Sequence, residues 1–152
     1  MNINVSKLVN NLLSGLEAKP KEILEGRYGL KSGAVRTLAE IGADYRVTRE
    51  RVRQIENHSL NQLKKMFPAS GAKSLVDLVK NHLKNLGGLR RENQLLNDLR
   101  VMVADPNTAQ LANKVHFLLE VFGAPHWSPE NQETHAYWYL TEEDRKKAEN
   151  FL

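Results

Sequence analysis

The chain has 152 residues and a formal net charge of +4, with 41% hydrophobic and 26% charged residues, the composition of a soluble globular protein with one ordinary domain or two small ones. It contains no cysteine, which excludes disulfides and thiolate metal sites and is compatible with a reducing, cytoplasmic location. No apolar run approaches the roughly 18–20 residues that cross a bilayer, and the N-terminus lacks the pattern of a signal peptide. We therefore expect a cytoplasmic protein without a membrane partner.

The charge is distributed unevenly along the chain. Residues 1–73 carry 13 Lys and Arg against 7 Asp and Glu, a net charge of +6, whereas residues 74–152 carry 9 against 11, a net charge of −2. This difference suggests that only the first half is built to meet a polyanion such as nucleic acid. A chance imbalance is the alternative.

The first half is predicted to be helical throughout. Apolar residues at helical spacing and helix-starting residues predict helices over residues 4–15, 20–27, 38–44 and 49–66. Thr37 and Thr48 are the expected N-caps of the last two, because their hydroxyls can accept a backbone N–H of the first turn. A short helix, a tight turn and a longer helix form the order of a helix-turn-helix.

The helix over 49–66 has one apolar and one polar face. Its apolar residues at helical spacing are Val52, Ile55, Leu60 and Leu63. The opposite face is centred on Glu50, Gln54, Asn57 and Asn61, with Arg51 and Arg53 on its shoulders and Arg49 in the first turn. Such a helix suits the major groove, since Glu and Gln can read base edges and Arg can bind guanine or phosphate. A solvated helix face is the simpler alternative.

The second half predicts a different fold. Pro68 and the small residues after it indicate a domain boundary, giving a domain over 1–67, a linker over 68–74 and a second domain over 75–152. The second domain is predicted to contain helices over 75–86, 89–99 and 108–122, a turn at 105–107, a β-hairpin with arms at 126–127 and 136–139, and a closing helix capped by Thr141. This is the element order of a winged-helix domain, so the chain is expected to be mainly α with one β-hairpin.

No pattern in the sequence indicates catalysis. The five histidines form neither an HExxH motif nor a pair four residues apart, and there is no nucleophile elbow or P-loop. We expect no enzyme activity, no catalytic residue, no metal, no cofactor and no small-molecule substrate. The aromatic residues Trp127, Tyr137, Trp138 and Tyr139 could stack on bases, but packing of the hairpin on the helices is the favoured reading.

Three short motifs in the first half resemble one known family. They are Arg27-Tyr28-Gly29-Leu30, Thr37-Leu38-Ala39-Glu40-Ile41-Gly42 and the run VTRERVRQIE from Val47 to Glu56. In register, they make roughly residues 16–66 similar to region 4 of the bacterial sigma-70 family, the domain that reads the −35 promoter element. The resemblance implies base reading by Arg49, Glu50 and Gln54. It implies phosphate contacts by Lys19, Lys21, Arg27, Arg36, Thr37, Leu38, Arg51 and Arg53.

The chain departs from the family in two respects. Arg46 stands in the turn where the family often has Gly, and a positive φ there would cost about 1 kcal/mol. Nothing resembles the sigma region that binds the −10 element and the polymerase clamp, so we expect no activity as a stand-alone sigma factor. The family also docks on the β-subunit flap of RNA polymerase, which makes that flap an implied partner.

The second half resembles, more loosely, the winged-helix domain of the polymerase delta subunit. The resemblance is carried by Gly87-Gly88-Leu89, the segment from Val115 to Leu119, and the two tryptophans. It implies an accessory contact to polymerase, another protein or DNA, and the net negative charge of this half argues against tight DNA binding.

The expected function is therefore sequence-specific binding of duplex, promoter-like DNA in transcription, together with contact to RNA polymerase. Two alternatives stay open. The chain could dock on the polymerase β flap with little DNA reading, or it could be a regulator that binds its own operator independently of polymerase.

Overall fold

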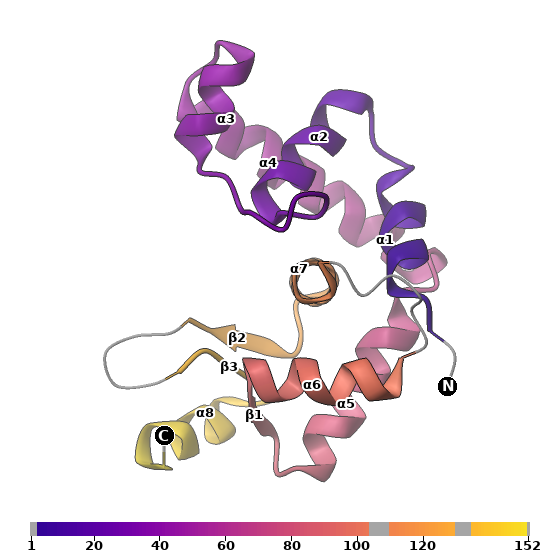
Figure 1. Cartoon of the computed structure of the whole chain (residues 1–152), viewed down its shortest axis with the longest axis vertical. Coiled ribbons are helices and arrows are strands. Elements are labelled where there is room, and N and C mark those ends of the chain that lie inside the picture. The colour runs from indigo at the N-terminus through magenta and orange to yellow at the C-terminus, as the bar shows by residue number, and fades with distance from the viewer. Residues whose placement is uncertain (1–2, 104–109, 130–134, 152) are drawn as a thin grey trace.

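The computed structural model describes residues 3–103, 110–129 and 135–151. The fold is mainly α, as predicted (Figure 1). The described helices are α1 (Val5–Leu13), α2 (Ala18–Tyr28), α3 (Leu38–Tyr45), α4 (Arg49–Met66), the 3₁₀ turn η1 (Phe67–Ala69), α5 (Lys73–Asn85), α6 (Glu92–Met102), α7 (Leu111–Phe122) and α8 (Glu142–Phe151). Three short strands are described, namely β1 (Leu89–Arg91), β2 (His126–Ser128) and β3 (Tyr137–Tyr139).

Local signals place the helices of the first half. The side chains of Thr37 and Thr48 both accept a hydrogen bond from the third residue of the following helix, each at 3.1 Å, as predicted. Helices α2, α3 and α4 then enclose a small core of Ile23, Ile41 and Val52, each at most 1% exposed. This core fixes the angle between α3 and α4.

The second half has winged-helix order: α5, β1, α6, α7, β2, β3. Its antiparallel sheet has the strand order β1-β3-β2, with Leu89 opposite Tyr139 and Trp127 opposite Trp138. The predicted hairpin is confirmed. The predicted turn at 105–107 and the predicted helix start at Thr108 lie outside the described residues.

One prediction for this half is wrong. Residues 89–91 were expected to begin a helix, but they form β1, and α6 begins at Glu92. Gly87 and Gly88 adopt positive φ values of 91° and 88°, which turn the chain after α5. The three following residues then hydrogen-bond to β3, a partner almost fifty residues later in the chain.

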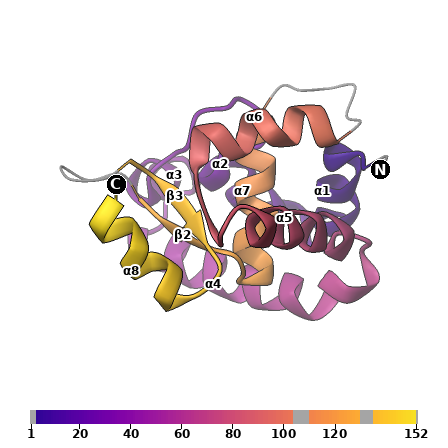
Figure 2. The ribbon, with the colours of Figure 1, turned by 90° about the horizontal axis from the view of Figure 1, so that it is seen from below.

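Helix α7 lies at the centre of the molecule. Figure 1 shows it end-on, with α1, α2 and α4 on one side and α5, α6 and the sheet on the other, and Figure 2 shows it enclosed by the same helices. One continuous hydrophobic core joins Val9 and Leu13 of α1, Leu63 of α4, and Phe117 and Leu118 of α7. The core therefore crosses residues 68–74, and the division into two domains there stays a prediction.

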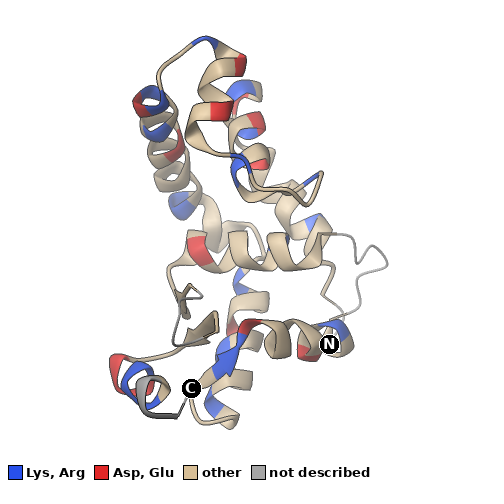
Figure 3. Ribbon diagram, turned by 60° about the vertical axis from the view of Figure 1, so that its left-hand side comes forward, with Lys and Arg blue, Asp and Glu red and all other residues tan. Residues whose placement is uncertain are grey.

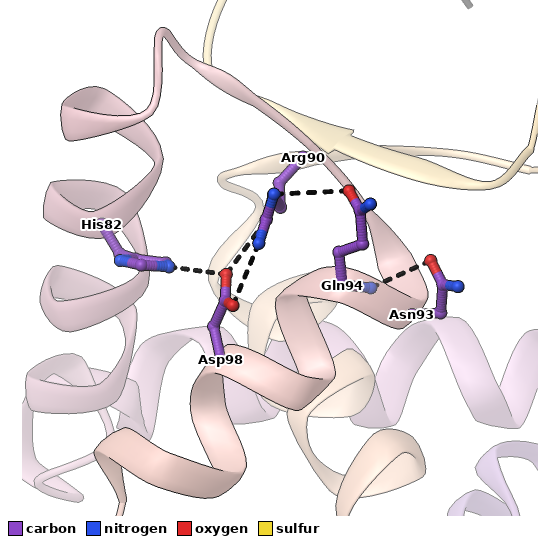
Figure 4. Close-up of polar contacts among 5 residues, drawn as sticks. All are labelled: His82, Arg90, Asn93, Gln94 and Asp98. Carbon is purple, nitrogen blue, oxygen red and sulfur yellow. Dashed lines mark hydrogen bonds and ion pairs between the residues drawn. The ribbon is translucent and has the colours of Figure 1, made fainter.

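A polar network joins α5, β1 and α6. Asp98 accepts from Arg90 through both carboxylate oxygens, at 3.0 and 3.1 Å, and lies 2.8 Å from His82 (Figure 4). The bond from Arg90 holds the pKa of Asp98 below its usual range, with a further contribution from His82. This network connects three consecutive elements beside the core, so we assign it a structural role.

Candidate nucleic-acid interface

A tight turn orients α4 relative to α3. Arg46 adopts φ 56° and ψ 43°. This is the left-handed conformation, which is consistent with the frequent occurrence of glycine at this position in the family that the sequence resembles. Gly42 allows the turn to pass close to α3, since a Cβ at Gly42 would lie 2.7 Å from the carbonyl oxygen of Val47. The amide of Val47 donates to the Gly42 carbonyl oxygen at 2.9 Å. The turn is thus held by a close backbone approach that needs a glycine.

The first turns of α4 present the three residues predicted to read bases. Arg49, Glu50 and Gln54 are all exposed. Glu50 and Gln54 lie on the side of α4 away from Val52, which is fully buried, whereas Arg49 is three residues before Val52 and is exposed at the start of the helix. The structure therefore leaves all three predicted base-reading side chains exposed in the first two turns of α4.

Two of these side chains already have partners on α4. Glu50 accepts from the Nε atom of Arg53 at 2.9 Å, and this bond lowers the pKa of Glu50 and raises that of Arg53. Arg51 makes a longer contact to Gln54, with 3.5 Å between Nη1 and Oε1. A base edge or phosphate would have to replace the ion pair between Glu50 and Arg53 in order to bind either side chain. The longer contact of Arg51 holds that side chain only weakly.

The start of α2 lies beside the same face. Lys19 lines a hollow of about 260 Å³ together with Arg51, Gln54 and His58. The Lys19 ammonium also lies 5.4 Å from the centre of the Tyr45 ring, a cation–π arrangement that holds it near the end of α3. The structure thus groups Lys19 with Arg51, whereas Lys21 is only partly exposed.

Arg27 occupies a different setting from the other predicted phosphate contacts. Its side chain is 28% exposed and pairs at 3.1 Å with Glu56 of α4, itself 12% exposed. It also donates from Nη1 to the carbonyl oxygen of Arg36 at 2.8 Å. Arg27 therefore ties α2 to α4 and to the α2–α3 loop, and its phosphate contact stays a prediction.

The start of α3 carries the remaining predicted contacts. Thr37 and Glu40 form a reciprocal capping box, in which the Thr37 amide donates to Glu40 at 3.1 Å. This arrangement leaves the amides of Leu38 and Ala39, which the box does not use, at the helix tip. The neighbouring Arg36 pairs with Asp44 at 2.6 Å, and this hydrogen bond raises the pKa of Arg36.

Charges of both signs alternate over this half. Figure 3 shows acidic and basic residues interleaved on its helices rather than a uniformly basic face. The ion pairs Arg27–Glu56, Arg36–Asp44 and Arg53–Glu50 account for much of this pattern. The net charge of +6 in residues 1–73 already counts both members of these pairs, so the positive excess is carried by lysines and arginines outside them.

The aromatic residues of the hairpin pack inward. Tyr137 is 3% and Trp138 is 2% exposed, and Trp138 belongs to the main hydrophobic core. The His116 ring contacts both Trp127 and Trp138, with centroid distances of 4.6 and 5.2 Å. Packing on the core, the favoured reading from sequence, accounts for Trp127 and Trp138, whereas Tyr139 is half-buried and packs against His126 and Tyr137.

Sequence reasoning missed two residues that support the interface. Glu56 anchors Arg27, and Asn113 of α7 donates to the carbonyl oxygens of Tyr28 and Gly33 at 2.8 and 3.4 Å. Glu56 lies within the VTRERVRQIE run and could have been recognised as a charge partner. No local signal connects Asn113 with residues about eighty positions earlier.

The described part of the chain offers little for other classes of site. Among its residues, no three or more His, Cys, Asp or Glu side chains gather as they would around a metal ion. Within the same ranges, no helix is both long and apolar enough to span a membrane.

Comparison with known proteins supports the resemblance. Residues 12–65 match the family model for sigma-70, region 4. The chain is 41% identical over 66 residues to the RNA polymerase principal sigma factor HrdD of Streptomyces coelicolor, covering 43% of this chain and 20% of the relative. It is 39% identical over 71 residues to the chloroplastic RNA polymerase sigma factor sigF of Arabidopsis thaliana, and 45% identical over 56 residues to the RNA polymerase sigma factor SigA of Microcystis aeruginosa. These alignments cover 47% and 37% of this chain.

The chain aligns with a fifth or less of the length of these relatives, which is 13% for sigF and 14% for SigA. The similarity to sigma-70, region 4 therefore lies in residues 12–65, and the second half of the chain lies outside the family-model match.

Proposed function

We propose that this protein acts in transcription by binding duplex DNA in association with RNA polymerase, and that it reads a −35-like promoter element. The main support is the agreement between the family match over 12–65 and the exposure of Arg49, Glu50 and Gln54 in the first two turns of α4, called the reading face below. Arg can bind a guanine edge bidentately, Glu can accept from cytosine, and Gln can reach adenine. The relatives' names as RNA polymerase sigma factors support the association with polymerase.

The phosphate contacts in this proposal differ in strength. Lys19 and Arg51 line one hollow beside the reading face and are suited to grip the same strand. The amides at the start of α3 provide a second anion-binding position. Arg27 is proposed to act mainly by holding the loop before α3, because both of its described contacts are internal.

Selection from randomised duplexes with the purified full chain tests this function. A −35-like consensus is the expected result. Recovery of an unrelated palindrome would favour the alternative of an operator-binding regulator that works apart from polymerase. Absence of any enriched sequence would contradict the base-reading assignment.

Docking on the polymerase β flap is the second candidate. The structure limits where an apolar partner could bind, because the apolar residues of α1 and the end of α4 are packed against α7. A pull-down with the flap, run beside a gel shift, separates the two functions. Flap binding without duplex binding would favour the docking module over the DNA reader.

A further inference from the structure

We propose that α7 of the second half is a positioning helix for the DNA-contacting surface, and that Asn113 holds the α2–α3 loop in its DNA-binding conformation. This inference rests on the proposed function, because it concerns how the loop presents Arg36 and the start of α3 to phosphate. It assigns the second half of the chain a part in DNA binding without a DNA contact of its own.

The surroundings of α7 argue against a direct role in the groove. Seven of its twelve residues are buried: Leu111, Lys114, Val115, Phe117, Leu118, Leu119 and Val121. Even Lys114 is only 7% exposed, and its ammonium lies 2.8 Å from the Ser6 hydroxyl of α1. The one exposed side chain of α7 is the carboxylate of Glu120, which would repel phosphate. Helix α7 therefore acts inside the molecule.

The Asn113 side chain hydrogen-bonds to two backbone carbonyl groups, at the end of α2 and in the α2–α3 loop. Its Nδ2 atom donates to the carbonyl oxygen of Tyr28 at 2.8 Å and to that of Gly33 at 3.4 Å. Both partners can only accept, so the amide nitrogen must face them. Between these residues, Gly29 has a φ of 64°, and a Cβ there would lie 2.8 Å from the same nitrogen. The close approach of Asn113 thus fixes the end of α2 and the middle of the loop together.

A second contact from α7 holds the same end of α2. The Tyr28 hydroxyl donates to Glu120 at 2.8 Å, and the Tyr28 ring packs edge-on against Phe117 at 5.0 Å between centroids. Burial and the neighbouring Glu120 raise the pKa of Tyr28, which keeps the hydroxyl protonated as a donor.

The α2–α3 loop connects the residues held by Asn113 to Arg36 and Thr37, two of the predicted phosphate contacts. The Arg36 amide donates to the Gly26 carbonyl oxygen at 3.0 Å, and the Arg36 carbonyl accepts from Arg27 at 2.8 Å. The Arg36 side chain then pairs with Asp44 of α3. Thr37, the cap of α3, follows directly. The loop is thus held by Asn113 at Tyr28 and Gly33 and by α2 at Arg36.

The test compares Asn113→Asp with Asn97→Asp in the full chain. Asn113→Asp keeps the size of the side chain but places a carboxylate against two carbonyl oxygens, whereas Asn97 of α6 is exposed and its described hydrogen bond comes from Arg100 of the same helix. Both substitutions add the same negative charge, so general repulsion of DNA is matched. We expect Asn113→Asp to speed amide exchange over residues 30–36 by about fivefold or more. We expect it to weaken binding to every duplex by roughly three- to tenfold, with an unchanged ratio of preferred to scrambled sequence.

Several outcomes would overturn the positioning role. They are unchanged loop exchange, an affinity equal to that of Asn97→Asp, or a loss confined to the preferred duplex. If Asn113→Asp does not fold, Asn113→Ala removes the donor without adding charge and carries the same expectations. Failure of the unaltered chain to bind any duplex would instead refute the proposed function, and the exchange of residues 30–36 would then decide separately whether Asn113 holds the loop.

Discussion

At the scale of single residues, substitutions in the first turns of α4 can distinguish contacts to bases from contacts to phosphates. Glu50→Ala or Gln54→Ala should relax sequence preference, because each removes a group suited to a base edge. Arg51→Ala should weaken all duplexes alike and reduce the slope of log affinity against log salt by about one unit. Titrations of preferred and scrambled duplexes at several salt concentrations measure both effects.

Arg100→Ala is the matched control for Arg51→Ala. Arg100 is an exposed arginine on α6 whose described contact is to Asn97, so its loss changes the total charge without changing the reading face. Equal losses on every sequence for the Glu50, Gln54 and Arg51 variants would show that none of them reads a base.

Arg46 provides a test of backbone strain. Because it adopts φ 56°, Arg46→Gly should raise the free energy of unfolding by about 0.5–1 kcal/mol, the strain relieved less the entropy cost of glycine. Arg46→Ala keeps a Cβ and should give no such gain, although both variants lose the same charge. Urea unfolding of the two variants distinguishes them, and equal stability would argue against strain at this turn.

At the scale of elements, α7 carries a histidine, His116, whose contribution to the stability of the protein depends on pH. Burial by itself lowers the pKa of His116, but hydrogen bonds to Glu120 and Glu92 outweigh it and raise the pKa to about 9. A raised pKa in the folded state stabilises the protein fully below the unfolded pKa of about 6.5 and loses that contribution as the pH rises to about 9.

We therefore expect the free energy of unfolding to fall by on the order of 2 kcal/mol between pH 6 and pH 9.5 through this group. His116→Gln should remove that part of the pH dependence and leave a flatter profile. Denaturant unfolding of both proteins across this range measures the difference. A parallel decline in the two proteins would show that His116 is not responsible.

At the scale of the whole molecule, the core around α7 predicts cooperative unfolding. Residues from α1, α4 and the second half share that core, so the two halves should lose structure together. Both tryptophans, Trp127 and Trp138, lie in the second half, whereas circular dichroism reports helices in both. Coincident transitions by fluorescence and circular dichroism are expected. A separate transition seen only by circular dichroism would instead support independent domains divided at residues 68–74.

The sequence by itself determined the helix-turn-helix. The caps Thr37 and Thr48, the apolar spacing of α4 and the strain at Arg46 depend on neighbours within a few residues, so local physical chemistry is enough to predict them. The exposed positions of Glu50 and Gln54 follow from helical periodicity once the buried stripe is known, and that of Arg49 follows from its place at the start of the helix.

Only the tertiary structure decided how these parts are supported. Strand β1 exists because β3 offers it hydrogen bonds, and the helical pattern of residues 89–99 concealed it. The pairing of Arg27 with Glu56 and the contact of Asn113 with the α2–α3 loop join residues 29 and about 80 positions apart. Packing brings such pairs together. Glu56 can be recognised in the sequence as a possible charge partner, but no local pattern identifies Arg27 as the residue that it pairs with or Asn113 as a contact of the loop. Helix α4 and its exposed residues can therefore be predicted from the sequence, whereas the packing of α7 against α4 depends on the assembled core.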